Sequence, residues 1–514
     1  MKDIKIKGLR SLVDTGTVEI KPINVLVGTN SSGKSTFLRT FPLIRQSIER
    51  KTRGPILWNG VYTDFDSFAT SVHRNGSDDE TKEIEFHFSI PFEVYLGFRR
   101  KETLNIRASI SIRSVPKAQS CYTSEYKVDL DGHEIKFHLN FEGVIEKVSS
   151  SRLSWELEKK AQIKHQLVNK DSIIPIIKHP DYGYYDLSET GDNMSSRLFN
   201  QITGLVRQHS GSQSKNKINQ MARQLTRTFR NDLEKIKLMK SISSTQRWRD
   251  TIEQWDREKD TDFLFFSGLI DLYALIENSY EINRIVSQQF KNVRYIAPLR
   301  ASTERYYRYQ DLSVDELDHR GENLGVFLIN IPRKWRTNLD LWTKKHFGFK
   351  IDDKKSSSHI AINLEYGDGY GSANVADMGF GFSQILPIVV QLWSVASGYE
   401  ESQKSKSSLP YIFAIEQPEL HLHPRMQATL AEVFSNSITL AKENEIDLRL
   451  IIETHSNAMI SKFGDLVAFD ELDEKHIGVI LFEQDMHARK SSLMHSNFNE
   501  DGELESWPTG FFSY

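Results

Sequence analysis

The sequence has very little cysteine and no long apolar run, and both absences narrow the class of protein. Its 514 residues contain a single cysteine, Cys121, which excludes an internal disulfide framework and fits a reducing compartment. No stretch approaches the roughly 18 consecutive apolar residues that a membrane-spanning helix needs. The N-terminal residues MKDIKIKGLR alternate charged and apolar side chains like a strand, without the apolar segment of a signal peptide. We therefore predict a cytoplasmic protein that does not use a membrane.

The chain also lacks an overall excess of charge of one sign. Lys and Arg number 66 and Asp and Glu number 69, which gives a net charge of −3. Balanced totals can hide a local excess, and residues 197–260 hold fourteen Lys or Arg against seven Asp or Glu. This basic segment predicts either sequence-independent binding of nucleic acid through phosphates or docking of an acidic or RNA-bearing partner. The alternative is that these basic residues only form a solvent-exposed surface and bind no partner.

Hydropathy patterns divide the chain into three parts. Residues 3–8 and 18–27 are typical of strands, and period-2 alternation from 83 to 148 predicts an antiparallel sheet made of hairpins. The next part, 152–290, is mainly helical and includes TDFLFFSGLIDLYALIENSYEINRIV, which predicts a helix packed into a core or a partner. Strand-like runs return from residue 293. We predict an α/β fold in which a nucleotide-binding domain, residues 1–150 and 293–514, is interrupted by a basic helical insertion at 151–292.

The stretch GTNSSGKST, residues 28–36, matches the phosphate-binding pattern G-x-x-x-x-G-K-[ST] between a predicted strand and a predicted helix. Glycines let backbone N–H groups curl around phosphates, and the positive end of the following helix adds to the attraction. Lys34 would neutralise the β- and γ-phosphates, and the Ser35 hydroxyl would bind Mg²⁺. A glycine turn without nucleotide is the alternative. The predicted nucleotide-binding residues are Gly28, Asn30, Ser31, Ser32, Gly33, Lys34, Ser35 and Thr36.

A phosphate loop needs a second strand that ends in a carboxylate, and YIFAIE supplies Glu416 for the metal side. The next residue, Gln417, stands where related ATPases carry a catalytic glutamate, and an amide cannot act as a general base. A later apolar strand, LRLIIE, is followed by His455, which can reach a γ-phosphate as a sensor, while Glu453 can orient water or neighbouring groups. A structural acidic residue at the end of a buried strand is the alternative for Glu416.

The stretch VADMGFGFSQILPIVVQLW begins with two glycines that open an apolar helix. Backbone N–H groups and small residues at a helix start can hold the γ-phosphate of a nucleotide bound to another subunit. The predicted residues of this loop are Gly379, Gly381, Ser383 and Gln384.

The order GTNSSGKST, MGFGFSQ, AIEQPELHLHP and ETHS resembles that of ABC-type ATPases of the SMC, Rad50, RecF and OLD-like group. The resemblance covers residues 1–85 and 293–514. It implies ATP and Mg²⁺ at residues 28–36, a signature loop at 379–384 that acts in trans, Glu416 as the metal-strand carboxylate and His455 as the switch histidine. It also implies a head-to-tail homodimer that encloses two nucleotides, with PELHLHP at its seam.

Three further stretches, ILWNGVYTDFDSF, YIAPLRASTERYY and DGELESWPTGFF, resemble a prokaryotic subfamily of stand-alone ABC ATPases with a C-terminal domain of unknown function. Related PtuA-type ATPases of Septu and retron-associated phage defence work beside a separately encoded nuclease. The resemblance therefore implies a sensor or regulator of a nuclease effector, and the sequence carries no recognisable nuclease site of its own. The alternatives are a DNA repair or DNA-maintenance ATPase that binds DNA directly and a scaffold that scarcely turns ATP over.

The sequence departs from this family pattern at three positions. Gly379 replaces the usual signature serine, no glutamine stands where a Q-loop is expected, and Gln417 replaces the catalytic glutamate. Gln417 is either native to the subfamily or an engineered substitution, and Glu419 is the runner-up for the general base. His421 and His423 fit a dimer-seam loop better than a metal site, since no cysteine or carboxylate cluster accompanies them. We predict slow hydrolysis and a long-lived ATP-bound dimer.

Overall fold

A computed structural model describes residues 1–73, 82–96, 100–153, 173–177, 194–227, 229–242, 245–255, 260–298, 304–356, 358–367, 371–403, 409–485 and 490–506. The tail motif WPTGFF, residues 507–512, lies outside these ranges, as do residues 299–303 within YIAPLRASTERYY. The chain divides into two compact units. Unit 1 comprises Met1–Leu9, Ser47–Asn59 and Phe65–Gln288, and unit 2 comprises Arg10–Gln46, Gly60–Asp64 and Gln289–Tyr514.

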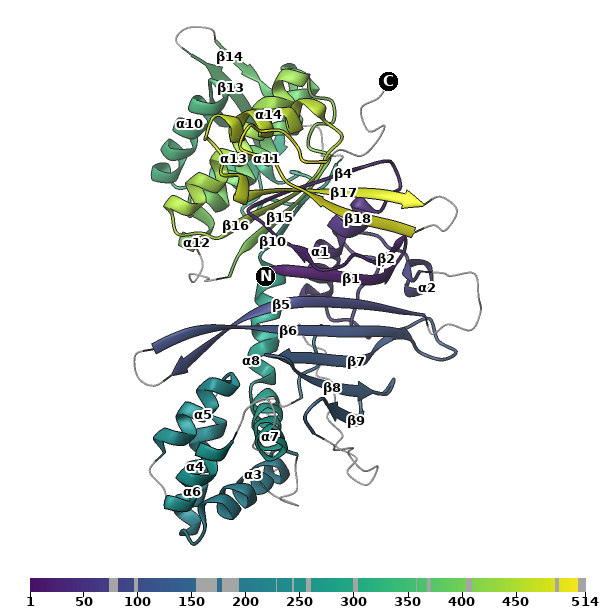
Figure 1. Cartoon of the computed structure of the whole chain (residues 1–514). Coiled ribbons are helices and arrows are strands. Elements are labelled where there is room, and N and C mark those ends of the chain that lie inside the picture. The colour runs from purple at the N-terminus through teal and green to yellow at the C-terminus, as the bar shows by residue number, and fades with distance from the viewer. Residues whose placement is uncertain are drawn as a thin grey trace. The chain divides into compact units, whose positions relative to one another are not determined.

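Unit 1 contains an antiparallel sheet whose strands pair in the order β1-β5-β6-β7-β8-β9 (Figure 1). Side chains of β8 alternate between buried and half-buried, as the period-2 pattern predicts for a sheet with one covered face. Asp131 and Gly132 connect β7 to β8 with φ of 54° and 82°, the positive values that a two-residue hairpin turn requires. The strands are β1 (Asp3–Leu9), β5 (Glu83–Leu96), β6 (Arg100–Ser114), β7 (Cys121–Leu130), β8 (His133–Leu139) and β9 (Ile145–Ser150).

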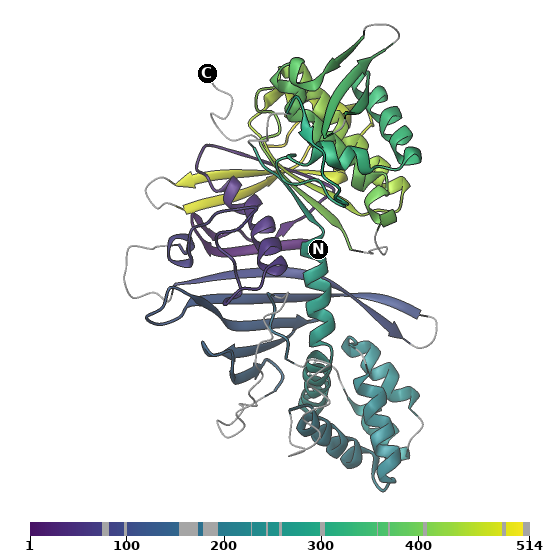
Figure 2. The same ribbon diagram turned by 180° about the vertical axis from the view of Figure 1, so that it is seen from behind.

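The helices of unit 1 follow the sheet in sequence, and α3 to α7 are drawn in teal in Figure 2. Four of them begin at a polar residue, Ser214, Asn231, Thr245 or Asp260, whose side chain accepts a backbone N–H of the first turn. The helices are α2 (Phe68–Ser71), α3 (Met194–Ser210), α4 (Lys215–Thr226), α5 (Asp232–Ser241), α6 (Gln246–Gln254), α7 (Thr261–Glu277) and α8 (Ser279–Lys291), which extends into unit 2.

The apolar segment expected to form one helix forms two, because α7 ends at Asn278 before α8 begins. Asn278 has φ −100° and ψ 7°, outside the helical region, and its side-chain amide donates to the Ala274 carbonyl at 2.8 Å. The Asn278 backbone N–H donates to the same carbonyl at 3.0 Å, so the side chain adds a second hydrogen bond at the end of α7.

Buried polar and charged side chains link the sheet of unit 1 to its helices. His133 of β8 lies 2.9 Å from an Asp271 oxygen on α7, and Lys235 of α5 lies 2.7 Å from the other oxygen. All three side chains are at most 3% exposed. Such a pairing is needed because an isolated charge inside a protein is strongly unfavourable.

Unit 2 is built on a six-stranded sheet of order β10-β15-β16-β4-β17-β18. Its first five strands are parallel, and β18 runs antiparallel at one edge. A parallel sheet buries both faces, and β4, β15 and β10 are buried at every position. The strands are β4 (Ile23–Gly28), β10 (Val293–Ile296), β15 (Tyr411–Glu416), β16 (Leu448–Glu453), β17 (Ile477–Asp485) and β18 (Lys490–Ser496), and two short strands, β2 (Leu12–Asp14) and β3 (Val18–Glu19), precede β4.

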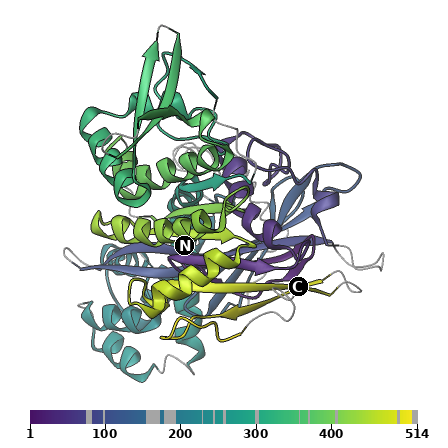
Figure 3. The same cartoon turned by 90° about the horizontal axis from the view of Figure 1, so that it is seen from above.

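The helices of unit 2 pack with this sheet into one hydrophobic core. A smaller antiparallel sheet, β11-β13-β12 with β14 beside β13, projects at one end of the unit (Figure 3). Its strands are β11 (Tyr307–Arg308), β12 (Phe349–Ser356), β13 (His359–Tyr366) and β14 (Ser372–Asn374). The helices are α1 (Lys34–Glu49), which extends into unit 1, α9 (Leu324–Asn330), α10 (Arg333–Phe347), α11 (Phe380–Ala396), α12 (Tyr399–Gln403), α13 (Pro424–Glu443) and α14 (Asn457–Ala468). The chain is thus a mixed α/β protein, and none of its described helices combines the length and apolar character needed to cross a membrane.

Candidate nucleotide-binding site

The glycine-rich loop connects β4, a central strand of the parallel sheet, to the start of α1. Two of its glycines occupy positions that no other residue would fit. Gly28 has φ +147°, and a Cβ there would lie 2.1 Å from the Phe482 carbonyl oxygen on β17. Gly33 has φ +97°, and a Cβ would lie 2.9 to 3.0 Å from the side chains of Leu12, Ser11 and Ser491. The glycines are therefore required by backbone conformation and by close packing.

The Lys34 side chain closes the loop on itself. Its ammonium donates to the Gly28 carbonyl at 2.9 Å and to the Thr29 carbonyl at 2.7 Å, and the residue is only 3% exposed. Burial lowers the pKa of Lys34, and the nearby Glu453 opposes that shift. The Ser32 hydroxyl is fully buried and has no hydrogen-bond partner among the described residues. A cationic group and a donor without a partner thus lie together in a loop of the shape that binds phosphate.

The other predicted loop residues differ in exposure. Asn30 and Ser31 are exposed, and Ser31 has a positive φ of 64°. Thr36 is buried inside the first turn of α1, where its carbonyl accepts a hydrogen bond from the Thr40 hydroxyl at 2.9 Å. A bound nucleotide would therefore meet the exposed part of the loop, with Thr36 behind it.

Two carboxylates end neighbouring parallel strands beside this loop. Glu416 is the last residue of β15 and is paired in register with Glu453, the last residue of β16. Glu453 is in turn paired with Leu26 of β4, so β16 lies between the Glu416 strand and the strand that leads into the loop. Both carboxylates therefore lie at the carboxyl ends of their strands, on the same side of the sheet as the start of the glycine-rich loop.

Glu416 is held by other side chains of the protein. The Arg39 guanidinium donates to one oxygen at 2.8 Å and to the other at 2.5 Å, and the Tyr295 hydroxyl donates at 2.8 Å. Glu416 is 3% exposed. The pKa of Arg39 is raised through its hydrogen bond and charge interaction with Glu416, against the opposing effect of burial. Burial, followed by the Glu416 charge, raises the pKa of Tyr295.

Glu453 has fewer hydrogen-bond partners than Glu416. One oxygen accepts a hydrogen bond from the Ser35 hydroxyl at 2.8 Å, and the other is buried without a partner among the described residues. Burial and then the charge of Glu416 raise the pKa of Glu453 to about 7, although Ser35 and Lys34 act in the other direction. The sequence prediction grouped Ser35 with Glu416 as metal-side residues, whereas the structure brings Ser35 into contact with Glu453.

The remaining predicted catalytic residues surround the ends of β15 and β16. The Gln417 backbone N–H donates to the Glu453 carbonyl at 2.9 Å, and Gln417 has a positive φ of 42°. A Glu419 oxygen accepts the His455 backbone N–H at 2.7 Å, so Glu419 fixes the loop that carries the histidine. The His455 residue is exposed, and burial of part of its ring together with the charge of Lys34 lowers its pKa, which favours the neutral imidazole.

The predicted signature loop leads into α11. Gly379 is exposed and has φ +87°, and no atom lies within 4 Å of a Cβ placed there. A Cβ on Gly381 would lie 3.4 Å from a Leu422 methyl carbon. Ser383 and Gln384 are buried, at 4% and 1% exposure, and the Ser383 hydroxyl is 3.5 Å from the Gly379 carbonyl. In this structure the loop therefore presents glycine backbone, rather than the Ser383 hydroxyl, to its surroundings.

Metal-ligand clusters are absent from the part of the chain that the structure describes: no group of three or more His, Cys, Asp or Glu side chains could hold a metal ion. His423 caps α13 by accepting the Arg425 N–H on its Nδ1 at 3.4 Å. A Mg²⁺ ion at the glycine loop would thus depend on oxygens of the nucleotide itself, which is usual for Mg²⁺ in phosphate-transferring proteins. The residues present fit that arrangement, because a hydroxyl and a carboxylate oxygen without a partner lie next to the loop.

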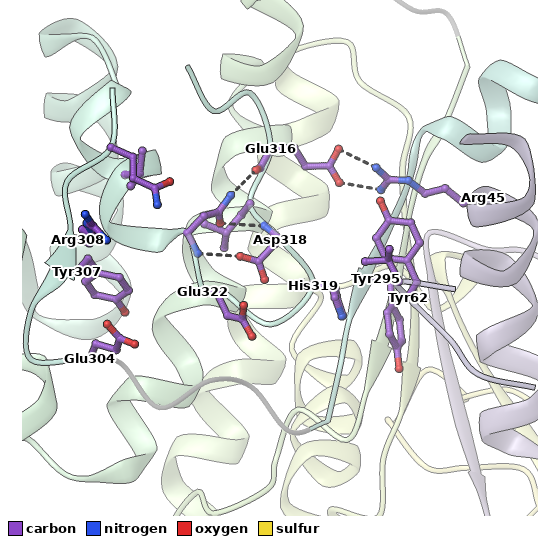
Figure 4. A pocket seen from close by; sticks show the side chains of 15 residues that line it. Arg45, Tyr62, Tyr295, Glu304, Tyr307, Arg308, Glu316, Asp318, His319 and Glu322 are labelled. Carbon is purple, nitrogen blue, oxygen red and sulfur yellow. Dashed lines mark hydrogen bonds and ion pairs between the residues drawn. The ribbon is translucent and has the colours of Figure 1, made fainter. Parts of the chain in front are cut away.

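Unit 2 also contains a separate cavity of about 960 Å³ (Figure 4). The residues that line it include four acidic ones, Glu304, Glu316, Asp318 and Glu322, and two arginines, Arg45 and Arg308. The carboxylates outnumber the basic side chains that line this cavity, so it is electrostatically unsuited to a triphosphate. Tyr295 lines the cavity and also donates to Glu416, as described above. The glycine loop, and not this cavity, is therefore the candidate nucleotide site.

Arg39 and Tyr295 are site residues that the sequence reasoning missed. Arg39 lies four residues after Ser35 on α1, one helical turn along the same face, and this spacing was the available signal. Tyr295 is on β10, whose place beside β15 follows only from the strand order.

Comparison with known proteins places these features in a family. The model of the AAA ATPase domain matches residues 1–460. Endonuclease GajA from Bacillus cereus (strain HuB5-5) is 24% identical over 228 residues, which cover 40% of this chain and 30% of that protein. The chain thus spans under a third of the length of this relative. The family match supports the prediction of an ATPase, while the finer subfamily stays a prediction. The chain belongs to the AAA ATPase domain family.

Proposed function

We propose that the chain binds ATP with Mg²⁺ at residues 28–36 and hydrolyses it slowly. The observation that carries this proposal is the state of Lys34. The residue is 3% exposed and its ammonium is held by two backbone carbonyls, with no direct ion pair among the described residues, although the charge of Glu453 acts on it. A buried cation without a direct ion-pair partner is unfavourable, and a nucleotide phosphate would supply a negative charge in contact with it.

The residues around the loop then take distinct roles. Lys34 neutralises the phosphates, and Ser35 offers its hydroxyl to the Mg²⁺ ion that accompanies the nucleotide. The ion would stabilise charge that develops on the phosphate oxygens. His455, with its lowered pKa, can donate or accept a hydrogen bond near the terminal phosphate as a neutral imidazole. Gln417 can orient a water molecule but cannot take its proton, and turnover is therefore slow.

Release of phosphate from ATP tests the catalytic part of this proposal. We expect slow, Mg²⁺-dependent release by the wild-type chain and none by Lys34→Ala, with Gln417→Glu faster than wild type by about tenfold or more if position 417 is the place of the general base. A rate unchanged in Lys34→Ala would contradict the site. A rate unchanged in Gln417→Glu would move the base to another residue, with Glu419 next in order.

We further propose that ATP joins two chains head to tail. In support, the exposed backbone at Gly379 precedes α11, where N–H groups of a helix start can meet a phosphate held by a second chain. Light scattering tests this: the mass should double with Mg²⁺ and ATP, and it should remain that of one chain for Lys34→Ala. A mass independent of nucleotide would contradict ATP-driven dimerisation.

The motif resemblance supports a regulatory role for this dimer, as the sensor subunit of an antiphage defence complex that controls a separately encoded nuclease. The named endonuclease among the relatives is compatible with this role but matches over only 30% of its own length. The basic residues between 197 and 260 favour a second candidate, a DNA repair or DNA-maintenance ATPase that binds DNA directly. DNA-stimulated ATP turnover that weakens with salt would favour the second candidate. A nuclease whose activity depends on ATP bound to this chain would favour the first.

A further inference from the structure

Three side chains of unit 1 form a hydrogen-bonded chain that the nucleotide site does not use. The Ser150 hydroxyl lies 2.6 Å from Nε2 of His133, and Nδ1 of the same ring lies 2.9 Å from an Asp271 carboxylate oxygen. In this order of side chains an imidazole can take the proton of a hydroxyl nucleophile while a carboxylate orients the ring. His133 and Asp271 are buried and Ser150 is half-buried. The nucleophile is thus the member of the three that a small molecule can reach.

A cavity of about 470 Å³ lies at Ser150. Its volume falls in the range, roughly 300 to 1,000 Å³, that holds a small organic ligand. Leu153 and Phe265 give the lining an apolar part, and the Asp262 carboxylate makes an anionic ligand unfavourable. The remaining charged residue of the lining, Arg152, already pairs with a carboxylate of α5 at 2.9 Å. The cavity therefore suits an uncharged molecule with a small apolar part.

Close packing fixes the segment that carries Ser150 against α7. Gly268 precedes Asp271 by three residues on this helix, and a Cβ on Gly268 would lie 2.9 Å from a Leu153 methyl carbon and 3.1 Å from the Arg152 Cβ. The backbone N–H groups of Arg152 and Leu153 donate to Ser150 Oγ at 3.1 and 3.2 Å. When Oγ bonds to an acyl carbon, negative charge develops on the neighbouring carbonyl oxygen. Two N–H groups that converge on Oγ are placed to stabilise that charge.

We propose that Ser150 is a nucleophile, with His133 as its general base and Asp271 as a positioning residue, and that this site cleaves small uncharged carboxylic esters. Ser150 Oγ bonds to the ester carbonyl carbon while its proton passes to His133 Nε2. The bond from that carbon to the alcohol oxygen then breaks, and the departing oxygen takes the proton from His133. Water gives a proton to His133 and attacks the acyl carbon, which releases the carboxylic acid and returns the proton to Ser150. The proposal does not rest on the nucleotide site.

A fluorophosphonate probe, which reacts with activated serine hydroxyls, and the ester p-nitrophenyl butyrate test this assignment on the full-length chain. The wild-type chain should take up the probe at Ser150, as located by peptide mass spectrometry, and should hydrolyse the ester. Ser150→Ala should lose the label and at least about tenfold of the ester hydrolysis. Ser151→Ala is the matched control, because it removes a neighbouring serine hydroxyl that lines the same cavity, and it should keep both activities within about twofold. A wild-type chain that is not labelled at Ser150, or that does not hydrolyse the ester, overturns the proposal.

The roles of His133 and Asp271 need a readout that a structural role alone would leave unchanged. Asp271→Asn keeps the shape of the side chain but can donate to Nδ1, which leaves Nε2 protonated and unable to accept the Ser150 proton. Its kcat for the ester should fall at least about tenfold while KM stays within about threefold of wild type, and His133→Gln should behave in the same way. An unchanged kcat in either folded variant would overturn the triad. If circular dichroism shows that a variant is unfolded, labelling of the wild-type chain in heavy water replaces it: a general base makes labelling slower there, and equal rates would overturn the role of His133.

Discussion

Replacing Glu453 by Gln should stabilise the metal-free protein at neutral and alkaline pH. Burial and the charge of Glu416 raise the pKa of Glu453 from its ordinary value of 4.5 to about 7 in the folded state. The folded state therefore binds a proton more tightly than the unfolded state, and the stability that this proton supplies is present at low pH and is lost as the pH rises through 7. A glutamine resembles the protonated acid and carries no such penalty.

The pKa difference sets the magnitude of this effect. At 1.36 kcal/mol for each pKa unit, the shift from 4.5 to about 7 corresponds to roughly 3 kcal/mol at pH 8 and to under about 1 kcal/mol at pH 5. At roughly 2 °C for each kcal/mol, Glu453→Gln should melt about 6 °C above wild type at pH 8 and within about 2 °C of it at pH 5.

Thermal melts of both proteins in EDTA, followed by circular dichroism, make the comparison, and Glu443→Gln on the exposed end of α13 is the control. The control should show no pH-dependent difference from wild type. A Glu453→Gln variant that is less stable than wild type at pH 8, or equally displaced at both pH values, would refute the reasoning about this carboxylate.

Three further substitutions probe the packing and charge pairs. Gly28→Ala puts a Cβ 2.1 Å from the Phe482 carbonyl at a φ of +147°, and it should cost roughly 2 kcal/mol or more in urea unfolding; wild-type stability would contradict the close approach. Arg39→Ala leaves the buried Glu416 without its counter-ion and should cost on the order of 3 kcal/mol by the same measurement, whereas a neutral result would mean that the pair is not formed. Asp271→Ala leaves the buried Lys235 of unit 1 with Asp232, at 3.2 Å, as its remaining carboxylate partner and should cost roughly 2 kcal/mol, with a loss smaller than about 0.5 kcal/mol as the contrary outcome.

The strand, glycine-rich turn and helix around residues 28–36 could be predicted from the sequence because their information is local, while phosphate binding there stays a prediction. The pattern of residues 28–36, the preceding β4 and the following α1 are all contiguous, and each glycine has a conformational reason to be there. The hairpins of β5 to β8 were predictable for the same reason, since alternation and the Asp131-Gly132 turn are short-range signals.

The partners of the two carboxylates could not be predicted in the same way. Ser35 and Glu453 are 418 residues apart in sequence, and Arg39 and Glu416 are 377 apart. Which carboxylate meets Ser35 depends on the insertion of β16 between β15 and β4, and a strand order of this kind is a property of the whole sheet. The break at Asn278 was missed because apolar periodicity continues across it, while the chain leaves the helical conformation at that one residue. The division of the chain at residues 150 and 292, and the partners of the basic segment, stay predictions.

The most direct test of the central claim is calorimetric titration of ATP and Mg²⁺ into the wild-type chain and into Lys34→Ala. The proposed site predicts one nucleotide per chain for wild type and no measurable binding for Lys34→Ala, because removal of the ammonium leaves the phosphates without their buried counter-charge. Lys34→Ala that binds ATP with wild-type affinity, or a wild-type chain that binds none, would contradict it.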